Sequence, residues 1–165
     1  MRDIIHNCGE YEQFEIIKPF IEKSFALFED EFSMSVNKVE CVNIETNTTI
    51  NNINFVSTLS GGINANLIFS FERELAKEVL KNFAFLEYEE EMEEEMISEV
   101  VAEFLNIVIG NAIKDFNLDT RFNFSPPIGL FGEGKIFKNK SSDICKIKFD
   151  LNSGSMLIIY TTEKK

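Results

Sequence analysis

The sequence predicts an α+β fold in which a mostly antiparallel β-sheet packs with long helices. Three long segments place apolar residues every three or four positions, which is the spacing of amphipathic helices. Shorter segments alternate apolar and polar residues, which is typical of strands. Turns rich in glycine and asparagine join successive strands, as expected of antiparallel hairpins. At 165 residues, the chain has the length of one domain.

Helices are expected at residues 11–32, 72–85 and 92–116. In the first, the apolar positions are Phe14, Ile17, Phe20, Ile21, Phe25 and Phe28. Pro19 lies inside that pattern, so we expect it either to kink the helix or to mark its first regular turn. The third helix is the longest, and we expect one broad face of it to be buried.

Strands fill the rest of the predicted domain, and we expect about six of them in one sheet beneath three helices. Seven ranges are strand-like, namely 38–46, 50–59, 63–71, 121–124, 128–137, 144–151 and 156–162. Ser60-Gly61-Gly62 and Asn152-Ser153-Gly154-Ser155 are hairpin turns by composition. Ser125-Pro126-Pro127 should interrupt regular pairing, because proline cannot donate to a sheet.

The ends of the chain are polar, which predicts a flexible N-terminus at 1–10, one domain at 11–162 and a polar tail at 163–165. No apolar run approaches the roughly 18 residues that span a bilayer. The first residues also lack the apolar core of a secretion signal. Three scattered cysteines, Cys8, Cys41 and Cys145, favour reduced thiols. We therefore expect a cytoplasmic protein.

Acidic residues outnumber basic ones by 28 to 16. This balance argues against nucleic acid, whose phosphates need an electropositive surface, and equally against anionic membrane surfaces. It favours a protein partner with a basic or metal-bearing patch. Seven glutamates fall between Glu87 and Met96. They fit the solvated first turns of a helix, where the helix dipole favours carboxylates, or an acidic lip that faces a partner.

One narrow polar stripe runs along the predicted third helix. At roughly 100° per residue, its members fall within an arc of about 100°; they are Glu95, Glu99, Glu103, Asn106, Gly110, Lys114 and Asn117. Glycine in a helix costs about 1 kcal/mol relative to alanine, so Gly110 needs a compensating role. Close approach of another backbone, from the domain itself or from a partner, would supply one.

Glu103 and Asn106 are the candidate functional residues, because three positions apart on a helix they point the same way. A carboxylate and a carboxamide presented together can reach into another molecule's active site. Such a pair also occurs by chance on many solvated helices, so the pair alone is a weak signal. A conventional hydrolase is unfavourable, because His6, the only histidine, lies in the predicted flexible end. The sequence shows no metal-ligand cluster.

Several short motifs accompany the pair. Glu99 precedes Glu103-Phe104-Leu105-Asn106, and Gly110-Asn111 follows it, while Leu59-Ser60-Gly61-Gly62, Phe124-Ser125-Pro126-Pro127 and Gly132-Glu133-Gly134 lie to either side. From about residue 19 to 160 the chain resembles the CheC/CheX family of chemotaxis phosphatases. It is more similar to CheX, because the helical motif occurs once and CheC usually carries two copies. It departs from the family at Glu99, where Asp or Ser is usual.

The resemblance implies a CheC-like fold and an aspartyl-phosphate phosphatase. Its substrate would be a phosphorylated response regulator of the CheY type. Glu103 and Asn106 would be catalytic, and Glu99, Gly110 and Asn111 would contact the partner. No cofactor of its own is implied, because the partner would hold the divalent metal, which is Mg²⁺ in this chemistry. The resemblance also implies a homodimer through sheet edges, formed by the C-terminal half or by the strand near 61–71.

Two other functions stay open at this point. The first is a non-catalytic binding or adaptor module related to the flagellar switch proteins, which would keep the fold without needing the Glu103 and Asn106 pair. The second is an acidic interaction protein that binds through the Glu87–Glu95 run. Its affinity should collapse with salt, because exposed charges are screened over about 10 Å at 0.1 M.

Overall fold

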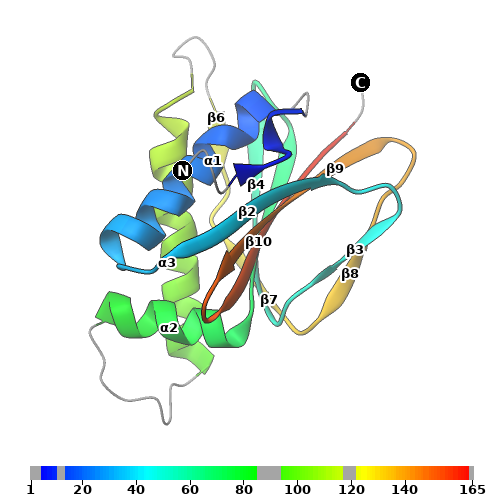
Figure 1. The fold of residues 1–165 in the computed structure, drawn as a ribbon. Helices are drawn as coiled ribbons and strands as arrows, with labels where there is room; N and C mark the ends of the chain where they lie inside the picture. The colour runs from blue at the N-terminus through cyan, green and yellow to red at the C-terminus, as the bar shows by residue number, and fades with distance from the viewer. Residues whose placement is uncertain (1–4, 11–13, 85–93, 117–121, 164–165) are drawn as a thin grey trace.

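The computed structural model describes residues 5–10, 14–84, 94–116 and 122–163, and it has the predicted α+β fold (Figure 1). Three α-helices are α1 (Phe14–Ala26), α2 (Arg73–Ala84) and α3 (Glu94–Ile113). Two short helices are η1 (Cys8–Glu10) and η2 (Leu27–Glu31). The strands are β1 (Ile5–His6), β2 (Val36–Asn43), β3 (Asn47–Ile50), β4 (Ile53–Gly61), β5 (Ala65–Phe71), β6 (Phe122–Phe124), β7 (Ile128–Phe131), β8 (Gly134–Phe137), β9 (Ser142–Leu151) and β10 (Gly154–Glu163).

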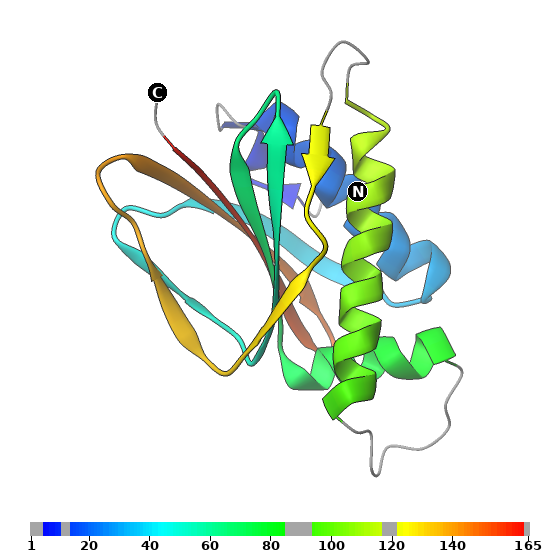
Figure 2. The same cartoon turned by 180° about the vertical axis from the view of Figure 1, so that it is seen from behind.

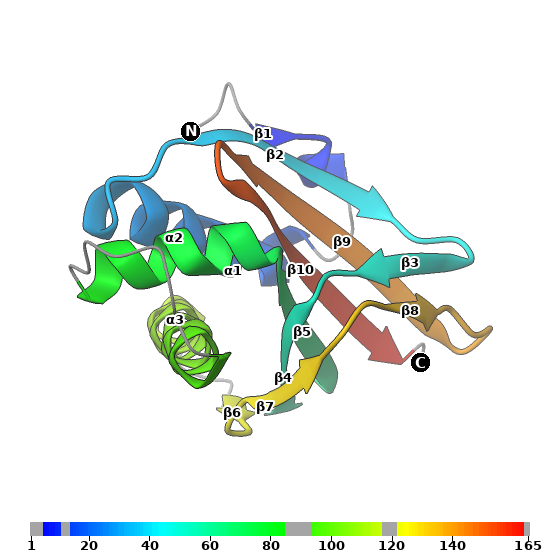
Figure 3. The same ribbon diagram turned by 90° about the horizontal axis from the view of Figure 1, so that it is seen from below.

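The main sheet has eight strands, in the order β1-β2-β9-β10-β5-β4-β6, with β7 also paired to β4. Its pairs are antiparallel except for β1 with β2. Strands β4 and β7 pair in the main sheet. The segments next to them in sequence, β3 before β4 and β8 after β7, pair with each other outside that sheet and form a separate two-stranded ribbon. Figure 3 shows the three helices on one face of the sheet and this ribbon on the other.

The centre of the sheet is β10, which is buried on both faces. Met156, Ile158 and Tyr160 contribute to the large core under the helices. Leu157 and Ile159 join Ile44 and Ile144 in a smaller cluster beneath the β3–β8 ribbon. A strand covered on both faces needs an unbroken apolar run, and Met156–Tyr160 provides one.

The first helix is regular only as far as Ala26. α1 continues on both sides of Pro19, which is buried, and is followed directly by η2, a π-helical segment. The amide of Phe32 there donates to the carbonyl of Leu27 at 3.1 Å. Wide turns of this kind are rare and occur often at functional sites.

The N-terminal segment differs from the sequence-based prediction. Residues 1–10 were expected to be flexible, but Ile5 and His6 pair with Val39 and Glu40 of β2, and η1 follows. This segment thereby lies along the sheet edge formed by β2. The pairing joins parts of the chain more than thirty residues apart, so local composition gave no sign of it.

The expectation of three reduced cysteines was wrong. Cys8 and Cys41 form a disulfide, with their Cα atoms 4.8 Å apart, because β1 lies along β2 and brings η1 beside Cys41. Scattered spacing in the sequence hid this proximity. Cys145 is the free cysteine; it is buried in β9, and burial raises the pKa of its thiol to about 11. A neutral buried thiol is a poor nucleophile.

Helix α3 is long and apolar enough, by length and composition alone, to cross a membrane. Eight of its residues are buried against the rest of the domain, namely Ile97, Val100, Val101, Phe104, Leu105, Val108, Ile109 and Ala112. The same composition is therefore explained by the central position of α3 in the core.

Candidate functional site

The site lies on α3, and Phe104 fixes the rotation of that helix. Its ring packs against Phe28 at 4.9 Å, Phe71 at 5.3 Å and Phe32 at 6.1 Å between ring centroids. Phe28 lies in η2, Phe32 directly follows it and Phe71 lies in β5, so η2 and β5 both meet α3 at this one side chain. Because Phe104 is held in this way, its neighbour Glu103 must point out of the core.

Glu103 and Asn106 are both exposed, whereas Phe104 and Leu105 between them are buried. Glu99 is exposed one turn earlier. In the described part of the chain, no hydrogen bond or ion pair engages the side chains of Glu103 or Asn106. Glu99, Glu103, Asn106 and Gly110 together are called the site stripe below. Figure 2 shows α3 beside β6 at one end of the sheet.

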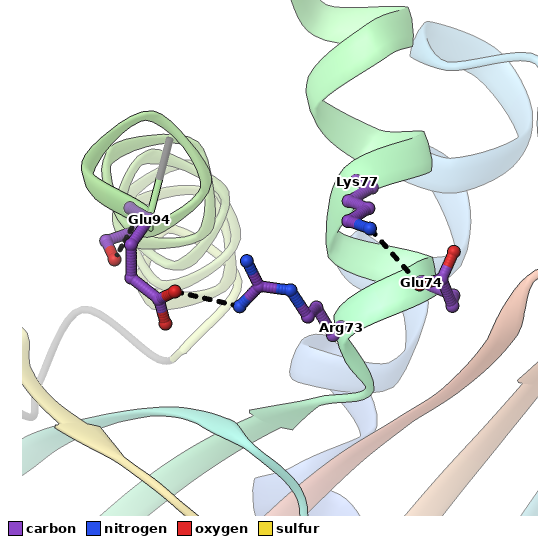
Figure 4. A network of polar contacts seen from close by, with 5 residues as sticks. Arg73, Glu74, Lys77 and Glu94 are labelled. Carbon is purple, nitrogen blue, oxygen red and sulfur yellow. Dashed lines mark hydrogen bonds and ion pairs between the residues drawn. The ribbon is translucent and has the colours of Figure 1, made fainter. Parts of the chain in front are cut away.

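Two ion pairs fasten the ends of α3 to the other helices. At its start, Arg73 of α2 contacts Glu94 at 2.9 Å, as Figure 4 shows. Near its end, Lys23 of α1 contacts Asp115 at 3.3 Å. All four side chains are at least one-third exposed, so each pair adds at most about 1 kcal/mol of stability. Their position indicates that they steady a helix whose register Phe104 sets.

Gly110 has free space around it. A methyl group built at its Cα would meet no atom within 4 Å outside the local helix backbone and its chain neighbours. The sequence left two explanations for this glycine, close approach by another part of the same chain or by a partner. Within the described residues, no other part of the chain approaches it. Approach by a partner stays a prediction.

Asn111 lies about 80° around the helix from Glu103, at about 100° per residue, and does not share the site stripe. Its Oδ1 accepts a hydrogen bond from Lys114 Nζ at 3.4 Å. With Ile107 it forms one wall of a hollow of about 450 Å³, which we call the helical groove. The other walls come from α1, η2 and α2 and include Lys23, Leu27, Asp30, Glu31, Phe32 and Phe83.

The sequence did not reveal the helical groove. Phe83 fits the apolar spacing of its helix, which predicts a core residue, yet it is 43% exposed. Its ring meets Phe32 edge-on at 5.9 Å. An apolar residue in the last turn of a helix is a weak signal, because only the packing of α1, α2 and α3 decides whether it is covered. Of the Glu87–Glu95 run, residues 87–93 lie outside the described residues, and Glu94 and Glu95 are exposed.

A comparison with models of protein families bears directly on this helix and its sheet. Residues 53–150, more than half of the chain, match the family described as chemotaxis phosphatase CheX. The chain belongs to the CheX family. The matched region runs from β4 to β9 and contains α3 with the whole site stripe. A comparison by sequence with curated proteins finds no match.

Solved structures of similar proteins have the same fold. A CheC-like superfamily protein from Shewanella sp. PV-4 has a TM-score of 0.74 and 21% identity, over 90% of this chain and 97% of its own. CheX from Desulfovibrio desulfuricans has a TM-score of 0.69 and 18% identity, over 90% and 99%. CheX of Borrelia burgdorferi, in a complex with CheY, BeF3 and Mg²⁺, has a TM-score of 0.62 and 22% identity, over 90% and 97%. These likenesses confirm the CheC-like fold.

Proposed function

We propose that this CheX-family protein removes the phosphoryl group from the aspartyl phosphate of a CheY-type response regulator. The observation that carries the proposal is the site stripe. A carboxylate and a carboxamide project together from a helix that the core holds in register, and within the described residues neither has a partner in its own chain. Side chains presented in this way are available to a second molecule.

Asn106 is proposed to position the attacking water. Hydrolysis of an aspartyl phosphate requires a water oxygen in line with the bond from phosphorus to the aspartyl oxygen. The new bond forms at phosphorus, the old one breaks, and inorganic phosphate and a free carboxylate result. The amide of Asn106 can accept a hydrogen bond from that water and donate one to a phosphoryl oxygen. Most catalysis of phosphoryl transfer comes from such positioning and from charge stabilisation.

Glu103 is proposed to anchor the helix in the partner. A carboxylate at this position can make a charge-assisted contact with a lysine beside the phosphoryl group. That contact would place Asn106, one turn along the same helix, against the phosphorus. Glu99 and Gly110 lie at the two ends of the stripe, where they would border the inserted surface.

The divalent metal is proposed to belong to the partner. The Borrelia complex contains Mg²⁺ and BeF3 together with CheX and CheY, and beryllofluoride is an analogue of a phosphoryl group. By analogy, this chain would need no metal of its own, because the regulator would bring Mg²⁺ with the phosphoryl group. A partner of this kind also implies a cytoplasmic location. We include that location in the proposal on the ground of the partner alone, because the Cys8–Cys41 disulfide removes the argument from reduced thiols.

A homodimer through a sheet edge is the remaining part of the proposal. The strand near residues 61–71 is β5, which lies inside the sheet between β10 and β4, so it offers no edge. The edge opposite β1 is formed by β6 and β7, which both pair with β4 and, within the described residues, with no strand on their other side. On β7, Ile128, Leu130 and Phe131 are 65%, 53% and 53% exposed. We propose this edge as the dimer contact.

The test is phosphate release from purified phosphorylated response regulators of the same organism, with and without this protein, at fixed Mg²⁺. We expect at least one regulator to lose its phosphate faster with the wild-type protein. Glu103→Ala should lower both the affinity for that regulator and the maximal rate, because one side chain anchors and positions. Glu45→Ala, an exposed glutamate in the turn between β2 and β3, is the matched control. If no regulator loses phosphate faster, the proposed function is wrong.

A further inference from the structure

The helical groove beside the site stripe is a hollow of about 450 Å³ with an apolar floor and an acidic rim. Leu27 and Phe32 are each 6% exposed and form the floor. Phe83 rises beside them and is 43% exposed, although its ring already contacts Phe32. Aromatic side chains, phenylalanine among them, are enriched in protein interfaces relative to the rest of a protein surface.

The rim carries an excess of negative charge. Asp30 and Glu31 are exposed and, among the residues that the structure describes, have no ion-pair partner. Lys23 also faces the groove, but Asp115 already pairs with it at 3.3 Å. Two carboxylates therefore remain without neutralisation beside an apolar floor. The complementary occupant is an apolar side chain with a lysine or arginine next to it.

The groove and the site stripe share one helix. Asn111 and Ile107 line the groove, and Asn106 lies five residues before Asn111, about 7–8 Å along the axis at 1.5 Å per residue. A specific protein complex commonly buries about 800 Å² on each partner. The four residues of the stripe cannot present that much surface. A partner that receives Asn106 must therefore also cover a flank of α3. Both flanks carry an open aromatic ring, and the more exposed one is Phe83 in the groove, at 43% against 37% for Phe124 of β6.

We propose that the helical groove is a second docking point for the response regulator, binding an apolar side chain of that partner with an adjacent cation. This inference rests on the proposed function for the identity of the partner. In this arrangement the stripe performs the chemistry, and the groove determines which regulators bind well enough to reach it. The groove residues are specificity determinants and touch no reacting atom.

The experiment measures binding and turnover separately. Binding is the Kd for a response regulator activated with Mg²⁺ and beryllofluoride, and turnover is kcat for phosphate release. Phe83→Ser should raise Kd about tenfold, as for a typical interface anchor, and leave kcat within about twofold of wild type. Glu31→Lys should also raise Kd, and its effect should shrink at high salt, because exposed charges are screened. Glu31 is exposed, so this variant tests the surface without disturbing the core.

Matched controls lie far from the helices. Phe137→Ser removes a phenylalanine of β8 that is 71% exposed, and Glu45→Lys reverses an exposed charge near the end of β2. Both should bind the regulator as wild type does. Groove variants that also bind as wild type would overturn the docking point, even if the phosphatase activity is real. Wild-type protein that binds through the groove but never accelerates phosphate release would instead overturn the proposed function. A wild-type protein that binds no regulator would overturn both.

Discussion

At Gly110, the structure leaves one of the two explanations that the sequence offered, which is close approach by a partner. Helix α3 would gain about 0.5–1 kcal/mol of stability from alanine there, and a methyl group would meet nothing in the chain's own packing. The protein itself has room for an alanine side chain at this position, yet the residue is glycine. We infer that a second molecule requires the small residue. A partner's surface that lies against the helix would provide that constraint.

We therefore predict opposite effects of Gly110→Ala on stability and on activity. The free energy of unfolding should rise by about 0.5–1 kcal/mol in a denaturant titration. The kcat/KM for the phosphorylated regulator should fall about tenfold, which corresponds to about 1.4 kcal/mol of lost transition-state binding. Ser98→Ala, on another side of the same helix, should leave kcat/KM unchanged. A Gly110→Ala protein with full activity would show that no partner approaches this turn.

At the scale of residues, the sequence predicted the orientation of the pair correctly. Glu103 and Asn106 both face solvent because helical periodicity is local, and Phe104 and Leu105 between them satisfy the apolar face. The disulfide of Cys8 with Cys41 could not be predicted, because it depends on the pairing of β1 with β2. The alternation of apolar and polar residues in a strand does not indicate which other strand it pairs with.

Among the elements, β7 is a strand that the sequence predicted without indicating which strand it pairs with. The predicted strand at 128–137 divides into β7 and β8, which pair with β4 and β3 respectively. The predicted break at Ser125-Pro126-Pro127 separates β6 from β7. Ser125 keeps this segment bonded to β4, because its Oγ accepts a hydrogen bond from the amide of Thr58 at 2.9 Å. The result is an edge with one side of its backbone unpaired within the described sheet.

Charges on this edge should prevent dimer formation. Ile128 and Leu130 point to the same face of β7, and a double change of both residues to lysine would place two positive charges on the proposed contact. We expect light scattering to give about twice the 19.0 kDa chain mass for wild type and about 19.0 kDa for the double variant. Phe137→Lys, on β8, should stay dimeric. A wild-type protein of monomer mass would rule out the dimer altogether.

At the scale of the whole molecule, the surfaces proposed for chemistry and for recognition lie on one side. The helices cover one face of the sheet (Figure 3). Helix α3 carries the site stripe, and α3 also lines the groove together with α1, η2 and α2. The β3–β8 ribbon covers the other face, and the proposed dimer edge lies along β7. A regulator docked on α3 would therefore approach from the helical side.

Composition and periodicity were sufficient for the fold class, because three helices and a set of hairpins allow few α+β arrangements. They were not sufficient for the groove. Its walls come from four elements, and the exposure of Phe83 depends on how closely those elements pack. The same limit applies to the flexible N-terminus predicted at 1–10. Residues 1–4 lie outside the described part of the chain, while residues 5 and 6 pair with β2 and residues 8–10 form η1.

The most direct test of the central claim is the rate of phosphate release by Asn106→Ala at saturating concentrations of the phosphorylated regulator. If Asn106 positions the water, this variant should bind the beryllofluoride-activated regulator with nearly the wild-type Kd and lose almost all of its stimulated kcat. Asn47→Ala, an exposed asparagine of β3, should retain both. An Asn106→Ala protein that turns over at the wild-type rate would contradict the account.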